Sequence, residues 1–164
     1  MPWWSITKSV LASAVLRLVD LGVVDLDSRF DDWPLTVRQL LQHTSGLMNY
    51  GGPTYQQAVS AGETVWPVDD LLRRCSAREL LFAPGEGWAY SNIGYLFLRR
   101  LIERTIECDL GTALHRLVVE PLHVTRTHIA AGPADMIQTL WGNPNNYDPR
   151  GPFMAYGLDL RSTP

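Results

Sequence analysis

The sequence predicts a single, predominantly helical domain with little β-structure. Its 164 residues are 46% apolar and 19% charged, which is the size and composition of one globular domain with a buried core. Apolar residues recur at helical spacings of three and four, and capping motifs mark where helices begin. After Gly132 this pattern gives way to breaker residues. We therefore expect a helical region over 1–131 and a loop-rich tail over 132–164 of one domain.

The first predicted helix starts at Thr7 and ends at Gly22. Its apolar residues describe a helix of about four turns with one buried face. These residues are Val10, Leu11, Ala14, Val15, Leu18 and Leu21. Ser5 lies at or just before the first turn, where backbone N–H groups and the positive end of the helix dipole favour an anion.

An acidic segment follows this helix. Its carboxylates belong to Asp25, Asp27, Asp31 and Asp32. The spacing matches no Ca²⁺-binding loop, because the central Gly and the final Glu are absent, so we expect turn and cap roles. Thr36 and Gln39 then form a capping box, which predicts a short helix over 37–43 that Gly46 ends.

The rest of the chain alternates helical patterns with loops. A helical pattern opens at Pro67, and a second capping box, from Ser76 to Glu79, starts a short turn. Apolar spacing predicts a long helix from Ile93 and another from about Thr112 to Pro121. The final stretch, Phe153 to Leu160, is typical of one short strand.

Composition excludes several classes of partner. A net charge of -3 and a pI near 5.7 give no broad attraction for nucleic acid or anionic lipid. No apolar run approaches the roughly 20 residues that span a bilayer, so we expect no transmembrane segment. We recognise no signal peptide, and the compartment stays open. Cys75 and Cys108 lie far apart in helical patterns, which favours two buried small hydrophobes over a disulfide.

Lys8 is the only lysine beside thirteen arginines. A guanidinium keeps its proton near pH 7, whereas a desolvated ammonium can lose it and act as a base. Ser5 stands three residues earlier on the same helix face, where such a base would activate it as a nucleophile. A Ser falls at that spacing by chance about one time in eighteen, so the motif needs support from elsewhere in the chain.

A second candidate group is Tyr90-Ser91-Asn92, between the Pro84-Gly85 turn and an apolar helix. A phenol and an amide two residues apart at a loop-to-helix junction can both point into a cleft. The alternative is a helix N-cap, with Ser91 or Asn92 capping and Tyr90 packing.

Several short motifs lie in order along the chain. They are Ser5-Ile6-Thr7-Lys8; Leu26-Asp27; Leu40-Leu41-Gln42-His43-Thr44-Ser45-Gly46-Leu47; Phe82-Ala83-Pro84-Gly85 with Tyr90-Ser91-Asn92; and Glu120-Pro121-Leu122 with Thr125-Arg126-Thr127. In this order and spacing they resemble the serine β-lactamase-related family, which includes class C β-lactamases, D-alanyl-D-alanine carboxypeptidases and related esterases. The resemblance implies an α+β, β-lactamase/transpeptidase-like fold, of which this chain covers mainly the helical lobe and lacks most sheet strands.

The resemblance also implies roles for individual residues. Ser5 matches the nucleophile that forms an acyl-enzyme, and Lys8 its neighbouring base. Tyr90 would share the proton with Lys8 and return it to the leaving group, while Asn92 would hold Lys8 or bind the substrate's amide. The implied substrate is a small-molecule or peptide amide, ester or β-lactam, and the family chemistry uses no metal or other cofactor.

The sequence departs from the family pattern at both ends. Four residues precede Ser5, and nothing after Asn92 reads Lys-Thr-Gly or His-x-Gly. We therefore expect a truncated domain with impaired activity, because losing one oxyanion donor costs about 10² to 10³ in rate. The helices would expose an apolar face, which favours association. The alternative is a noncatalytic helical remnant that acts as a binding or interaction module.

The remaining candidates carry weaker signals. His43 begins a superficial match to the missing third motif, but it precedes Tyr90-Ser91-Asn92, so we interpret it as structural. His123 and His128 lack a third metal ligand at a suggestive spacing, which favours surface or capping roles. The tryptophans near the motifs are candidates for lining the cleft, although Trp more often packs; they are Trp3, Trp4 and Trp88. A helical protein outside the family would hold Ser5 and Tyr90 beyond hydrogen-bonding reach.

Overall fold

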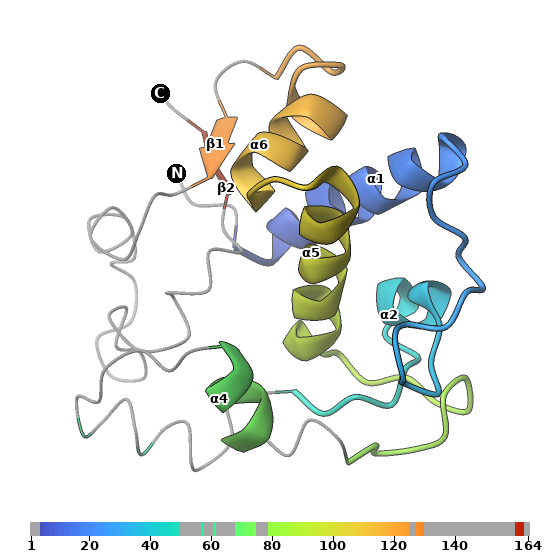
Figure 1. The fold of residues 1–164 in the computed structure, drawn as a ribbon. Helices are drawn as coiled ribbons and strands as arrows, with labels where there is room; N and C mark the ends of the chain where they lie inside the picture. Colours follow the sequence, from blue (N-terminus) through green and yellow to red (C-terminus); the bar gives the residue numbers. More distant parts are fainter. Residues whose placement is uncertain are drawn as a thin grey trace.

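The computed structural model describes residues 4–49, 57, 61, 68–74, 79–124, 127–129 and 160–162. These residues are mostly helical, in agreement with the predicted helical lobe (Figure 1). The elements are a 3₁₀ turn η1 (Trp4–Ile6), α1 (Thr7–Asp20), α2 (Val37–Gln42), α4 (Val68–Arg74), α5 (Asn92–Ile106), α6 (Leu110–Leu114), a π-helical turn η2 (His115–Val119), β1 (Thr127–Ile129) and β2 (Leu160–Ser162).

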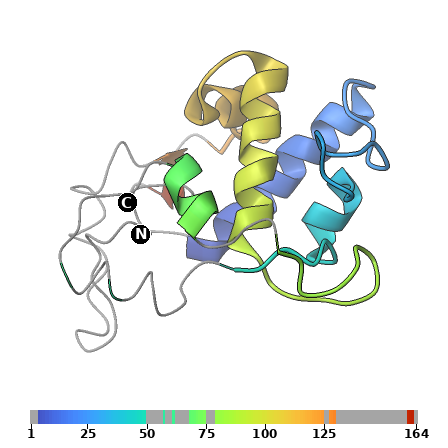
Figure 2. The ribbon, with the colours of Figure 1, turned by 60° about the horizontal axis from the view of Figure 1, so that its bottom comes forward.

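Helix α5 is the central element of the helical part. It contacts α1, α2 and α6, and Figures 1 and 2 show it crossing α1 with α2 to one side. Its first two turns, Asn92 to Leu98, are buried on every face. The N-terminus of α5 and the residue before it, Ser91, are therefore held from several directions. This fixes the segment that carries the predicted Tyr90-Ser91-Asn92 motif.

The packing of α1 against α5 forms the main core. The α1 residues Leu11, Ala14, Val15 and Leu18 have no exposed surface, so the centre of the predicted buried face is confirmed. Its two ends differ from the prediction, because Val10 is half-buried and Leu21, the C-cap, is 53% exposed. Burial of each large aliphatic side chain stabilises the fold by about 1.5 to 3 kcal/mol. Lys8 and Thr7 are also buried at the start of this face. The same packing that builds the core therefore brings the first turn of α1 to α5.

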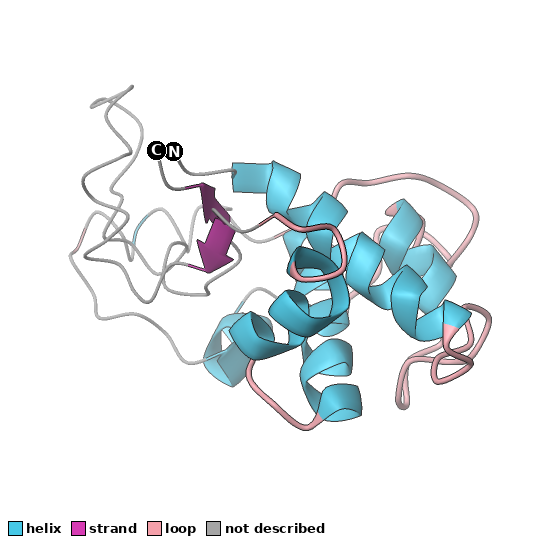
Figure 3. Cartoon of the chain, turned by 90° about the horizontal axis from the view of Figure 1, so that it is seen from above, coloured by secondary structure: helices cyan, strands magenta, loops and turns pink. Residues whose placement is uncertain are grey.

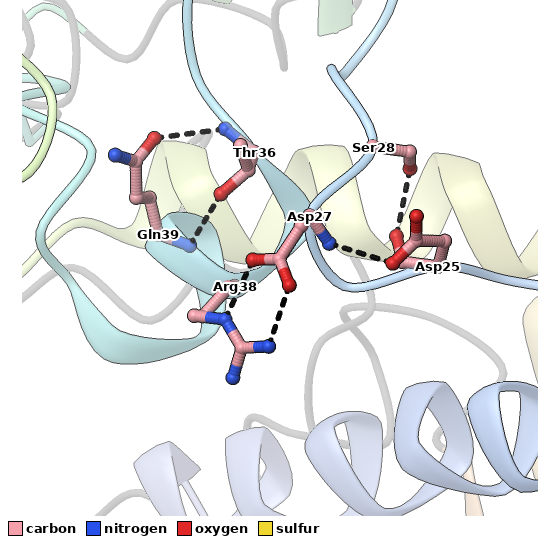
Figure 4. A network of polar contacts seen from close by, with 6 residues as sticks. All are labelled: Asp25, Asp27, Ser28, Thr36, Arg38 and Gln39. Carbon is pink, nitrogen blue, oxygen red and sulfur yellow. Dashed lines mark hydrogen bonds and ion pairs between the residues drawn. The ribbon is translucent and has the colours of Figure 1, made fainter.

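The acidic segment forms turns, as predicted, and also ion pairs, which the sequence did not predict. The Asp25 carboxylate accepts a bond from the Asp27 N–H, and Asp27 forms a two-bond pair with Arg38 of α2, with N–O distances of 2.8 Å (Figure 4). The capping box at the start of α2 is also confirmed, because the Thr36 and Gln39 side chains each bind the other's backbone N–H. This network fixes the entry of α2.

The last helical segment and the strands differ from the sequence prediction. The predicted helix from about Thr112 begins earlier, at Leu110, because the Asp109 carboxylate caps it by accepting from the Thr112 N–H. It then widens into the π-helical turn η2. Strand β1 was not predicted, and it pairs antiparallel with β2 beside the helices (Figure 3). Three-residue strands carry too little periodicity to be recognised in a sequence.

Other predictions meet the described residues only in part. Leu160 opens β2, and the rest of the predicted strand, Phe153 to Asp159, lies outside them, as do Cys75 and Ser76. Cys108 is a free thiol, half-buried against the core, which agrees with its interpretation as a small hydrophobe. In the part of the chain that the structure describes, no helix has the length and hydropathy to cross a membrane.

Candidate active site

The structure brings Ser5 and Tyr90 into direct contact although 85 positions separate them in the sequence. The Ser5 Oγ and the Tyr90 Oη lie 2.8 Å apart, within hydrogen-bonding distance. Ser5 is exposed in η1, immediately before α1, as predicted, and Tyr90 is half-buried two residues before α5. The contact between α1 and α5 holds the hydroxyl and the phenol together. A helical protein of unrelated architecture has no reason to show this contact.

Lys8 lies one helical turn after Ser5 and is 9% exposed. Its Nζ lies over the Tyr90 ring, 5.0 Å from the centroid, and over the Tyr95 ring, 5.7 Å from the centroid. Aromatic faces attract an ammonium at such distances, so the two rings hold the lysine head in place. The lone lysine is therefore buried between two phenols, one of which touches Ser5.

Asn92 is buried at the first position of α5 and is held by a residue that the sequence analysis missed. Its backbone N–H and its Nδ2 donate to the Asn49 Oδ1, at 3.0 and 3.1 Å. With Nδ2 engaged in this way, its own carboxamide oxygen is left as an acceptor. Asn49 lies in the loop after α2. An asparagine in a loop gives no sequence signal of this role.

Ser91 is the N-cap of α5, so the alternative interpretation of this motif is correct for its middle residue. The Ser91 Oγ accepts from the Gly94 N–H at 3.1 Å and donates to the Met48 carbonyl at 2.9 Å. Capping by Ser91 does not conflict with a site role for its neighbours, because the Tyr90 hydroxyl contacts Ser5 and the Asn92 side chain contacts Asn49. The cap instead fixes the backbone from which both side chains extend.

His43, which the sequence predicts to be structural, ends α2 in place of the predicted Gly46 and also contacts this motif. It is the C-cap of α2, with a left-handed backbone at φ 60° and ψ 28°. Its Nδ1 accepts from the Ser91 N–H at 3.1 Å, and its ring lies against Tyr90 and Tyr95, with centroids 4.7 and 5.0 Å apart. Burial, with a smaller effect of the Lys8 charge, lowers the pKa of His43.

Tyr95 completes the ring cluster around Lys8. It is buried, and its hydroxyl donates to the Leu41 carbonyl at 3.1 Å. Burial, followed by the neighbouring Tyr90, raises the pKa of Tyr95. This phenol therefore stays neutral, and its ring packs against the Lys8 ammonium. The Tyr90 hydroxyl, in contrast, contacts Ser5.

The other candidates lie apart from this cluster or outside the described residues. The Trp88 indole is 66% exposed and meets His43 edge-on, with centroids 6.0 Å apart. Trp3 lies outside the described residues, and so do the side chains of Trp4 and His128. His123 has a left-handed backbone, with φ 54°, in an exposed turn. No group of three metal-binding side chains occurs among the residues that the structure describes.

The helical lobe and the Ser-Lys-Tyr cluster together agree with a comparison against protein families. A sequence model described as Beta-lactamase matches residues 1–164, and the chain belongs to this family. The resemblance inferred from the sequence motifs is therefore confirmed.

Individual relatives include enzymes with different names. The chain is 36% identical to Esterase EstB from Burkholderia gladioli in an alignment of 139 positions that covers 72% of this chain and 35% of that protein. It is 28% identical to a D-aminopeptidase from Cereibacter sphaeroides in an alignment of 126 positions that covers 73% of this chain and 24% of that protein. The chain thus spans about a third or less of the length of these relatives.

A solved structure shows the same fold. A D-stereospecific amidohydrolase from Streptomyces sp. matches with a TM-score of 0.66 and 30% identity, over 76% of this chain and 43% of that one. The fold of the helical part is therefore that of the β-lactamase/transpeptidase-like proteins. The sheet of the predicted α+β class is represented among the described residues by β1 and β2 alone.

Proposed function

We propose that this chain carries the nucleophilic centre of a serine acyl hydrolase, in which Ser5 forms an acyl-enzyme with an amide, ester or β-lactam substrate. The 2.8 Å contact between the Ser5 Oγ and the Tyr90 Oη supports this proposal most directly. An exposed hydroxyl beside a phenol and a buried lysine is the arrangement that an activated nucleophile requires. The names of the relatives, an esterase, a D-aminopeptidase and an amidohydrolase, fit acyl transfer from esters and amides to water.

In the proposed reaction the Ser5 Oγ attacks the substrate carbonyl carbon. In the reactive form Lys8 holds the proton of the Tyr90 phenol, so that a phenolate lies beside an ammonium. The Oγ–C bond forms and the carbonyl π bond opens to an oxyanion as the Ser5 hydroxyl proton passes to this phenolate. The bond from the carbonyl carbon to nitrogen or oxygen then breaks, and Tyr90 returns the proton to the leaving group. Water, deprotonated by the same pair, hydrolyses the acyl-enzyme and regenerates Ser5.

Asn92 has a binding role in this proposal. Asn49 accepts from the Asn92 backbone N–H and from its Nδ2, which fixes the carboxamide. The carboxamide oxygen can then accept from the Lys8 ammonium or from the N–H of a substrate amide. Its buried position at the start of α5 gives this oxygen a fixed place relative to Tyr90.

Covalent labelling tests the proposed nucleophile. We expect a fluorophosphonate probe or a fluorescent penicillin to label the folded chain, and Ser5→Ala to abolish the label. The matched control is Ser9→Ala, which removes another exposed hydroxyl one turn further along α1 and should leave labelling unchanged. Absence of labelling of the native chain by either probe would instead support the noncatalytic binding module.

A second variant separates the base from the positive charge at Lys8. Lys8→Arg keeps a cation that can lie over aromatic rings but removes a group that can give up its proton. We expect the labelling rate to fall by about 10² to 10⁴, the range for loss of general acid–base catalysis. An unchanged rate with the probe still on Ser5 would assign the base to Tyr90 alone.

A further inference from the structure

His43 holds the chain on both sides of Tyr90. Its backbone carbonyl accepts from the Ala89 N–H at 3.0 Å, and its Nδ1 accepts from the Ser91 N–H at 3.1 Å. Its ring also lies against the Tyr90 ring, with centroids 4.7 Å apart. The residues before and after Tyr90 and the Tyr90 side chain are thus all in contact with one histidine. The hydroxyl of that tyrosine is the group that meets Ser5.

The contact to Ser91 depends on the protonation of the imidazole. A neutral imidazole has one donor and one acceptor nitrogen, and here Nδ1 is the acceptor, so the proton is on Nε2. An imidazolium has two donors and no acceptor. Protonation of His43 would therefore set its Nδ1–H against the Ser91 N–H and remove one of the two bonds that flank Tyr90.

The groups around His43 favour the neutral ring. Lys8 of α1 is the charged group that acts on it, and the phenols of Tyr90 and Tyr95 of α5 lie against its faces. Trp88 meets its edge and carries no charge. Burial and the Lys8 charge both disfavour the imidazolium and lower the pKa of His43. The ring is therefore neutral near pH 7, and it gains a proton only below the ordinary histidine pKa of about 6.5.

We propose that His43 is a positioning residue for Tyr90, and that its neutral imidazole keeps the phenol against Ser5. Its effect on turnover rests on the proposed acyl-transfer function, whereas its hold on the Tyr90 segment does not. This goes beyond the role of ending α2, because a residue that only ends a helix needs a left-handed backbone and no ring acceptor. Loss of the Nδ1 acceptor should move Tyr90 and slow Ser5 acylation without unfolding α2.

Two amide substitutions separate positioning from helix termination. The Asn side chain places its oxygen near the position of Nδ1, while the Gln side chain reaches toward the position of Nε2. Asn also readily adopts the left-handed backbone that position 43 requires. We expect His43→Asn to keep the probe-labelling rate at pH 7.5 within about fivefold of wild type, and His43→Gln to lower it by at least about tenfold. Labelling at the wild-type rate in His43→Gln would overturn the proposal.

The pH dependence of the labelling rate is a second test, because a purely structural role of His43 would leave it unchanged. In wild type the labelling rate should fall in acid with a midpoint below about 6.5, the ordinary pKa of histidine. His43→Asn carries no titrating ring, so this limb should be absent or shifted. An identical acid limb in wild type and His43→Asn would assign it to another group and overturn the pH dependence of the positioning.

We call the two hydrogen bonds from the Ala89 and Ser91 N–H groups to His43 the His43 clamp. A measurement that does not depend on catalysis tests this clamp. In ¹H–¹⁵N NMR spectra of the wild-type chain, the Ser91 amide signal should shift with pH in step with the His43 ring signals. The Ala89 amide, bound to the His43 carbonyl, should move less. A Ser91 amide that does not follow His43 overturns the clamp whether or not the chain is labelled. If Ser91 follows His43 but Ser5 is never labelled, the clamp stands and the proposed acyl transfer fails.

Discussion

Gly46 has less room for a side chain than Gly22, Gly85, Gly87 and Gly94. Its backbone is left-handed, with φ +78°, and a Cβ added there would lie 2.2 Å from the Phe82 carbonyl oxygen. The Gly46 carbonyl also accepts from the Leu81 N–H at 2.8 Å, so the two segments cannot separate without losing a hydrogen bond. Gly46 thus allows the loop after α2 to pack against the 80–82 segment that leads to Tyr90.

Substitution of Gly46 by Ala should therefore be severely destabilising. We expect Gly46→Ala to lower the free energy of unfolding by more than about 4 kcal/mol, because it combines a disfavoured backbone with a backbone clash. Gly22 is a matched control, since it has φ +73° but nothing within 4 Å of an added Cβ. Gly22→Ala should cost about 1 to 2 kcal/mol. Chemical denaturation measures both, and similar losses would show that the loop yields to the methyl group.

The residues of the site were predictable to different degrees. Ser5, Lys8, Tyr90 and Asn92 were named from short motifs, and the structure places Ser5, Lys8 and Tyr90 in one cluster. The contacts of His43 and Asn49 were missed. Both lie more than 40 positions from the residues they hold. Such contacts arise from how α2 packs against α5, and no local spacing encodes them.

Among the elements, α5 depends most on its cap. The Ser91 Oγ accepts from the Gly94 N–H and also donates to the Met48 carbonyl, and the residue is 1% exposed. Thr36, the N-cap of α2, accepts only from the Gln39 N–H in the described network and is half-buried. The two caps share the same helix chemistry but differ in burial and in the second hydrogen bond.

This difference sets the expected cost of removing each cap. Thr36→Ala should lower the free energy of unfolding by about 1 kcal/mol, the usual loss for an N-cap hydroxyl. Ser91→Ala should lower it by about 2 to 4 kcal/mol, because it also leaves the carbonyl of half-buried Met48 without its donor. Urea denaturation of the two variants gives both values. Equal losses would mean that water replaces the Ser91 hydroxyl at Met48.

Helices with one buried face were predicted correctly from the sequence. Elements that are very short, or whose burial depends on contacts with several other helices, were not. The face of α1 and the capping box of α2 were read from spacing alone. In α5 the first two turns are buried on all sides, because several helices surround them, and amphipathic spacing cannot show this. The π-helical turn η2 and the short strand β1 have no distinct sequence signature.

For the molecule as a whole, the titrating groups define a pH range of greatest stability. The lowered pKa of His43 means that its native-state stabilisation is present above the ordinary histidine pKa and is lost as pH falls through the native value. The carboxyls of Asp27 and Asp109, whose pKa values are lowered by Arg38 and by Thr112, act in the same direction at lower pH. Both are exposed, so solvent and salt reduce their effect.

The loss of stability at alkaline pH depends on Tyr95. Its raised pKa means that the native state keeps a proton that the unfolded chain releases, so stability is complete below the ordinary tyrosine value of about 10 and falls above it. A plot of urea midpoint against pH should therefore be highest between about pH 7 and 9.5 and fall on both sides. His43→Asn should flatten the decline that begins near pH 6.5, and Tyr95→Phe the decline above pH 10. Tyr95→Phe should also lower the plateau by about 1 kcal/mol, because it removes the hydrogen bond to the Leu41 carbonyl. Should each variant retain the wild-type slopes, the burial of these two rings would not govern how the stability of the molecule depends on pH.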